Sequence, residues 1–158
     1  MFKKILVAID GSEYSRHALP TAIEVAQKFG GDLVVLHVAE HDRGRAVAFS
    51  IESPAEATRL VADAVKKAKD ARLSAKGELF DRAAGHVAPA IAATAAANSI
   101  DLIVMGSRGL SDAQGFLLGS VTHRVMQLVD IPVLVARPPR GSRLAAGAGA
   151  AGPVATGS

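Results

Sequence analysis

Short apolar runs alternate with segments of helical character along most of this chain. Four runs are continuous and rich in β-branched residues: 5–9, 33–38, 102–105 and 131–136. Continuous apolar runs of this length are typical of strands buried on both faces, as in a parallel sheet. A more polar run at 78–81 predicts a further strand at a sheet edge.

The first helix is predicted over residues 12–29, between the first two strands. Ser12 or Ser15 serves as its N-cap, because a hydroxyl can accept a hydrogen bond from a first-turn N–H group. Gly30 follows as a stop signal. Pro20 lies inside this range, so it is expected either to kink the helix or to mark its true start.

The second helix is predicted to begin with a capping box formed by Ser53 and Glu56 and to close at Gly77. A third, alanine-rich helix is expected over 87–98, and a fourth follows Gly119. Strands and helices therefore alternate throughout. This order predicts a single α/β domain with a doubly wound, Rossmann-like parallel sheet of five strands and helices on both faces.

Composition and charge narrow the function classes. The absence of cysteine excludes disulfides and thiolate metal sites. No apolar run is long enough to span a membrane, and the N-terminus lacks a secretory pattern, so a cytoplasmic protein is expected. The net charge of +3 comes from three arginines in residues 137–158, and the remaining chain holds 15 basic and 15 acidic residues. This neutral body argues against a nucleic-acid partner.

A glycine-containing loop follows the apolar run at 102–105. Gly106, Gly109 and Gly119 let backbone N–H groups approach phosphate oxygens, and Ser120 opens the next helix, where the helix dipole favours an anion. Arg108 can add a charge-assisted contact. Without further information, a plain connection whose glycines serve as turns and caps remains an equal alternative.

Two common phosphate-binding motifs are absent from the sequence. No G-x-x-x-x-G-K-[ST] motif occurs, so there is no lysine in the position that such a loop uses to reach phosphate. The first strand is followed by "DGSEYS" rather than by G-x-G-x-x-G. A dinucleotide cofactor is therefore disfavoured.

The loop spacing G-x2-G-x9-G-S is similar to that of the ATP-binding branch of the universal stress protein family. The segments "KILVAIDGSEYSRHAL", "GGDLVVLHVAE", "IDLIVMGSRGLS" and "LLGSVTHRVMQLVDIPVLVARP" also resemble that family. The resemblance covers 2–138 and implies a domain over 1–138 with strand order 3-2-1-4-5. Residues 139–158, rich in alanine and glycine, are predicted to form a disordered tail.

The resemblance also implies a set of ATP contacts at the strand ends. Asp10 would face the adenosine, and Val38 would contact adenine through its backbone. Mg²⁺ or Mn²⁺ would arrive with the phosphates, since no residues show the spacing of a metal site. The implied nucleotide-binding residues are Ala8, Asp10, Val38, Met105, Gly106, Arg108, Gly109, Gly119, Ser120, Val121 and Thr122.

The expected function is that of an ATP-binding regulator or sensor in a stress response, with ADP or AMP as alternative ligands. A slow ATPase or autophosphorylating protein is one alternative, and a nucleotide-free interaction module is another. The last strand is expected at a sheet edge, where the resemblance implies a homodimer, and the downstream protein partner is unknown. Asp112 in the loop would repel phosphates unless it points outward or meets the metal. His37, in an apolar strand, is interpreted as structural.

Overall fold

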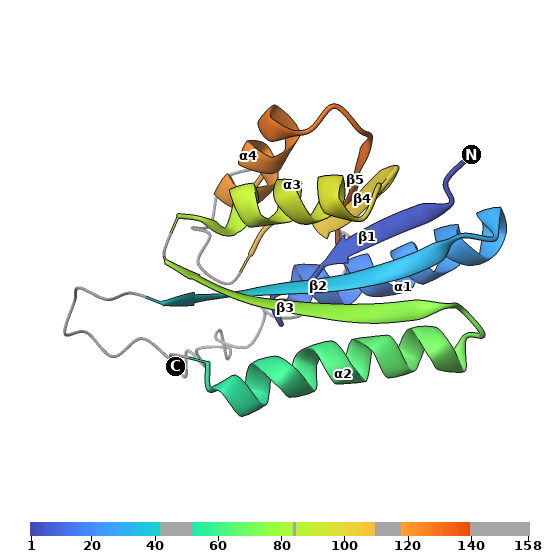
Figure 1. Ribbon diagram of the computed structural model, residues 1–158, viewed down its shortest axis with the longest axis horizontal. Helices are drawn as coiled ribbons and strands as arrows, with labels where there is room; N and C mark the ends of the chain where they lie inside the picture. The colour runs from blue at the N-terminus through green and yellow to red at the C-terminus, as the bar shows by residue number, and fades with distance from the viewer. Residues whose placement is uncertain (42–51, 84, 110–117, 140–158) are drawn as a thin grey trace, which may run out of the picture.

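The computed structural model describes residues 1–41, 52–83, 85–109 and 118–139. Asp112 and the predicted tail from residue 140 onward lie outside the described residues. None of the described helices combines the length and hydropathy that crossing a bilayer requires. The elements, shown in Figure 1, are β1 (Lys4–Ala8), α1 (Glu13–Phe29), β2 (Asp32–His41), α2 (Pro54–Asp70), β3 (Ala75–Ala83), α3 (Val87–Ala97), β4 (Leu102–Gly106), α4 (Ser120–Leu128) and β5 (Val133–Ala136).

The five strands form one parallel sheet in the order β3-β2-β1-β4-β5, which confirms the predicted fold. Ala8 at the end of β1 pairs with Leu36 of β2 and with Met105 of β4. The chain winds outward from β1 to β3 and then crosses back to β4. The direction of winding therefore reverses between β1 and β4, and ligands of such folds bind at the carboxyl ends of strands near this point.

Helices α1 and α2 cover one face of the sheet, and α3 and α4 cover the other (Figure 1). Successive residues of β1 point to opposite faces: Ile5 and Val7 join the α1–α2 side of the core, and Leu6 joins the α3–α4 side. Both sides are apolar. This two-sided burial explains why the strand runs are continuous in the sequence.

Helix α1 begins at Glu13, with Ser12 as its N-cap. The Ser15 N–H donates to Ser12 Oγ over 3.2 Å, so the choice between the two serines is settled in favour of Ser12. Gly30 ends the helix in the left-handed conformation, with φ of 61°. Pro20 is an interior residue of α1, and the prediction that it marks the true start is wrong.

Helix α2 has the predicted capping box but ends at Asp70, well before Gly77. Arg72, two residues after the helix ends, is in the left-handed conformation, with φ of 64°. Gly77 lies instead in β3, where a Cβ would collide with the Val61 side chain of α2. The prediction was wrong because this glycine serves close helix–sheet packing. It also lies inside an edge strand that is longer than the predicted 78–81.

Candidate functional site

The carboxyl ends of the three central strands bring five of the predicted site residues to one edge of the sheet. The Ile9 N–H donates to the Leu36 carbonyl over 2.9 Å, so the pairing of β1 with β2 continues past Ala8. Asp10 follows at the start of the connection to α1. Val38 lies two residues beyond Leu36 on β2, and β4 ends at Met105 and Gly106.

Val38 and Met105 form an apolar wall at this edge. They are 8% and 4% exposed and belong to the part of the core that faces α3 and α4. Ala8, half-buried, packs against the same cluster. An apolar surface beside a few polar groups is typical of small-molecule sites.

Asp10 is held in place by the loop that it opens. Its Oδ1 accepts a hydrogen bond from the Ser12 N–H over 2.9 Å. Gly11, between them, has φ of 79°, a conformation that favours glycine. The carboxylate of Asp10 therefore supports the turn into α1, and it does so at the edge where β1 ends.

Helix α4 begins beside the end of β4 without a side-chain cap. Its N-cap residue, Gly119, is extended, with φ of −72° and ψ of 158°, and donates its N–H to the Ser107 carbonyl over 2.6 Å. The first turn then carries Ser120 exposed, Val121 half-buried and Thr122 buried. The N–H groups of a first helical turn have no partner within the helix, and they carry partial positive charge.

Thr122 is already engaged through its side chain. Its hydroxyl donates to the Gly106 carbonyl over 2.9 Å, and the residue is only 2% exposed. The Thr122 hydroxyl therefore ties α4 to β4, and its hydrogen is not available to a phosphate. If Thr122 contacts a nucleotide as predicted, it must do so through its backbone N–H.

Ser107 was not singled out by the sequence. It is 1% exposed, and its N–H donates to the Ala136 carbonyl over 2.9 Å while its own carbonyl accepts from Gly119. One residue thus ties the ends of β4 and β5 to the start of α4. No sequence pattern marks it, because its contacts are made by backbone groups.

Gly106 has a packing reason to be glycine. A Cβ at this position would lie 2.8 Å from backbone and side-chain carbons of Tyr14, in the first turn of α1. The Tyr14 ring also lies below Arg108, whose guanidinium carbon is 5.8 Å from the ring centroid. Arg108 and Gly109, both half-buried, continue the loop as far as the structure describes it.

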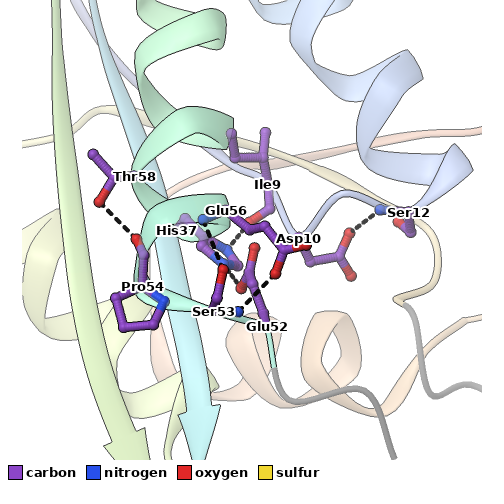
Figure 2. A network of polar contacts seen from close by, with 9 residues as sticks. All are labelled: Ile9, Asp10, Ser12, His37, Glu52, Ser53, Pro54, Glu56 and Thr58. Atoms are coloured by element: carbon purple, nitrogen blue, oxygen red, sulfur yellow. Dashed lines mark hydrogen bonds and ion pairs between the residues drawn. The ribbon is translucent and has the colours of Figure 1, made fainter.

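A polar cluster lies close to Asp10, on the α1–α2 side of the sheet end (Figure 2). His37 Nδ1 is 2.7 Å from the Ile9 carbonyl oxygen, and Nε2 is 2.6 Å from Oε2 of Glu52. Figure 2 shows Glu52 directly before Ser53, the N-cap of α2. The interpretation of His37 as a structural residue agrees with its 3% exposure and its two hydrogen-bond partners. Its partner Glu52 was missed, since nothing local in the sequence connects them.

Across the described residues, no group of three or more histidine, aspartate or glutamate side chains is arranged to hold a metal ion. The groups that the described residues bring to the strand ends are helix N–H groups, loop backbone, an acidic side chain and an apolar wall. Such a set suits an anion attached to an apolar or aromatic group.

Known proteins are similar to this chain in sequence and in fold. The chain is 33% identical to universal stress protein YxiE of Bacillus subtilis over 156 residues, which covers 87% of this chain and 100% of that protein. The structure of hypothetical protein MJ0577 matches with a TM-score of 0.75 and 26% identity, over 89% of this chain and 99% of the other. A universal stress protein from Archaeoglobus fulgidus in complex with dAMP matches with a TM-score of 0.65 and 22% identity, over 86% and 98% of the two chains. Residues 1–137 match the sequence model of the universal stress protein family, and the chain therefore belongs to that family.

Proposed function

We propose that this chain binds an adenine nucleotide, ATP in the first instance, at the carboxyl ends of β1, β2 and β4. The observation that carries the proposal is the start of α4, which has no side-chain cap and lies beside the central strand β4. An uncapped helix N-terminus is suited to phosphate, because it presents N–H donors and the positive end of the helix dipole. The dAMP complex of a structural neighbour supports this ligand class.

In this proposal the phosphates lie at Gly109, Gly119, Ser120, Val121 and Thr122 and are bound mainly through backbone N–H groups. Arg108 adds a charge at the same end. Mg²⁺ or Mn²⁺ comes with the phosphates and is held largely by them.

The base and sugar would lie at the other end of the site. Val38 and Met105 supply the apolar wall, with Ala8 beside them. Asp10 accepts hydrogen bonds from ribose or from the adenine amine, and Gly106 lets the sugar approach.

The biological role that we propose is nucleotide-dependent regulation in a stress response. Phosphoryl transfer ordinarily needs a positioned nucleophile and a cation on the terminal phosphate. The sequence has no G-x-x-x-x-G-K-[ST] motif and so no lysine of that motif to reach the phosphates. The Thr122 hydroxyl already donates to the Gly106 carbonyl. These features favour a protein that holds ATP over one that turns it over rapidly.

A homodimer through β5 is the second part of the proposal. β5 is an edge strand, and Leu134 on it is 38% exposed. Met126 and Leu128 of the neighbouring α4 are 41% and 40% exposed. A second copy pairing with β5 would cover this apolar edge. Light scattering at micromolar concentration should give twice the mass of the chain, and a monomer there would contradict this part.

The direct test of the ligand is to purify the chain without added nucleotide, denature it and chromatograph what is released. We expect about one adenine nucleotide per chain, the stoichiometry of a single site at the sheet switch point. Mostly ATP would indicate a holder, and mostly ADP a hydrolase. An empty protein that also fails to bind ATP with Mg²⁺ at millimolar concentration would contradict the proposal and favour a nucleotide-free interaction module.

A further inference from the structure

His37 has a hydrogen-bond partner on each ring nitrogen, and both partners are acceptors. The Ile9 carbonyl can only accept, so Nδ1 carries a hydrogen and donates over 2.7 Å. An ionised Glu52 carboxylate also only accepts, and it lies 2.6 Å from Nε2. A neutral imidazole has a single N–H and cannot donate to both.

The contact therefore holds one proton more than a neutral imidazole and a free carboxylate would carry. Either His37 is an imidazolium that donates from both nitrogens, or Glu52 is protonated and donates to Nε2. Both arrangements give the same two hydrogen bonds. If the proton is lost, a lone pair on Nε2 faces a carboxylate oxygen, and a separation of 2.6 Å is no longer stable.

This pair connects three segments that meet next to the proposed nucleotide site. His37 directly precedes Val38 on β2, and its ring contacts the carbonyl that directly precedes Asp10. Because a trans peptide unit is planar, fixing the Ile9 carbonyl also fixes the orientation of the Asp10 amide. Glu52 adds the start of α2 to the same cluster, as Figure 2 shows.

We propose that His37 and Glu52 are a proton-dependent positioning pair that sets the Ile9–Asp10 backbone and makes nucleotide affinity fall as pH rises. The inference rests on the proposed function, since it concerns the adenosine end of that site. The side chain of Glu52 is 32% exposed, so it can turn toward water once the proton is gone. The His37 side chain is only 4% exposed, and it then holds the Ile9 carbonyl without support from α2.

Other charged groups are carried by the elements around this pair. Among the described residues, the carboxylates on these elements include Asp10 after β1, Glu13 in α1, Glu40 on β2, Glu56 in α2 and Asp81 on β3. The same elements also carry the guanidinium groups of Arg16, Arg59 and Arg82, which stay charged, and the imidazole of His17. Carboxyl groups ordinarily titrate near pH 4, whereas imidazole titrates around pH 6 to 7. A change in affinity with pH is therefore assigned to the His37–Glu52 pair only where the substitution of Glu52 removes it.

The variant that separates this proposal from a structural role is Glu52→Gln. Its amide can donate to Nε2 of a neutral His37 while Nδ1 still donates to Ile9, so both hydrogen bonds persist without the additional proton. Isothermal titration with Mg²⁺ and ATP should show wild-type affinity falling about threefold to tenfold, relative to Glu52→Gln, from about pH 6 to about pH 8.5. Taking the ratio of the two ATP affinities at each pH cancels the effects of protons that bind to ATP itself and to the other histidines, because both proteins share them.

Glu24→Gln is the matched control, because it removes one exposed carboxylate from the middle of α1. It should keep the pH dependence of the wild type. A constant ratio between wild type and Glu52→Gln across the pH range would overturn the inference. A Glu24→Gln variant that loses the pH dependence would overturn it as well, because the effect would then not be specific to Glu52.

A readout without nucleotide keeps the inference separate from the proposed function. In nuclear magnetic resonance spectra of the unliganded chain, the Asp10 amide should shift with the titration of the His37 ring in wild type and stay fixed in Glu52→Gln. If the chain binds no nucleotide but these signals move together, the proposed function fails and the positioning pair remains. If ATP binds and the Asp10 amide ignores the His37 titration, the positioning pair is overturned and the binding function remains.

Discussion

Helices α2 and α4 differ in how their first-turn N–H groups are capped. Each helix begins with N–H groups that have no partner within the helix. At α2, Ser53 Oγ accepts from the Glu56 N–H over 3.2 Å, and the Glu56 carboxylate accepts from the Ser53 N–H over 2.8 Å. At α4, Gly119 has no side chain to offer. The first arrangement caps the helix with its own side chains, and the second has no side-chain cap at the position where we propose that a phosphate binds.

A missing cap alone does not distinguish α4. Helix α3 also lacks a side-chain cap at His86. The difference lies in the position in the sheet: α3 follows the edge strand β3, whereas α4 follows β4, at the point where the winding reverses. Gly119 is also tied to Ser107 and Thr122 to Gly106, so the start of α4 is fixed relative to the strand ends. An uncapped helix start therefore becomes a candidate site only where the sheet topology brings other groups to it.

The largest expected effect comes from giving α4 the cap that it lacks. Gly119 is extended, a conformation that aspartate adopts readily, so Gly119→Asp should cap the first turn with its own carboxylate. The carboxylate takes N–H donors from the phosphates and repels them. The loss of two charge-assisted hydrogen bonds corresponds to at least about a hundredfold weaker ATP binding in calorimetric titration.

His86→Asp is the matched control for this variant. It puts the same carboxylate at the other helix that lacks a side-chain cap, on the same face of the sheet. ATP affinity should stay within about twofold of the wild type, because β2 and β1 separate β3, which precedes α3, from β4, and salt screens a charge at that separation. Equal losses in the two variants would mean that net charge, and not the start of α4, controls binding.

Most of the fold could be predicted from local pattern. The central strands are continuous apolar runs because both faces are covered, and the capping box of α2 is visible in four consecutive residues. The error at Gly77 has a physical cause: a glycine after a helical stretch is a common stop signal, but here the close approach of Val61 requires it. That requirement comes from packing between α2 and β3 and leaves no local trace.

The site was less accessible to sequence reasoning. The glycine spacing indicated the loop, and the structure brings Ala8, Asp10, Val38, Met105 and Gly106 to one edge. The sequence did not reveal the contacts that join distant segments. These include the tie from Thr122 to Gly106, the packing of Tyr14 on that glycine, and the bond between His37 and Glu52. Each pair is held together by topology alone, so spacing along the chain carries no information about it.

A smaller effect is expected at α2, and it should appear in stability rather than in binding. Ser53→Ala removes the N-cap oxygen and should lower the free energy of unfolding by about 1 kcal/mol. For a domain of this size that corresponds to a melting temperature lower by about 2 to 4 °C in a thermal scan. ATP affinity should change by less than about twofold, because α2 donates nothing to the phosphates in the proposed site.

Ser74→Ala makes the same chemical change at an exposed serine before β3, and its melting temperature should match the wild type. The comparison between the two helices fails if Ser53→Ala weakens ATP binding as strongly as Gly119→Asp. The start of α2 would then be part of the nucleotide site.

The smallest effect concerns the charge in the capping box. The hydrogen bond from the Ser53 backbone holds the pKa of Glu56 below its ordinary value of 4.5, with a further contribution from the Ser53 side chain. A carboxylate with a lowered pKa in the folded state stabilises the fold above its ordinary pKa, and this contribution is lost as pH falls through the lowered value.

Glu56→Gln keeps an acceptor oxygen but not the charge. The melting temperature of the wild type should therefore exceed that of Glu56→Gln at about pH 7, and the difference should shrink as pH falls below the ordinary pKa of 4.5. Glu24→Gln, in the middle of α1, should show no such pH-dependent difference. If the difference for Glu56→Gln is the same throughout this pH range, the charge does not contribute, and α2 depends on its hydrogen bonds alone. Phosphate binding at the proposed site of α4 would then be expected to depend on the N–H donors more than on the helix dipole.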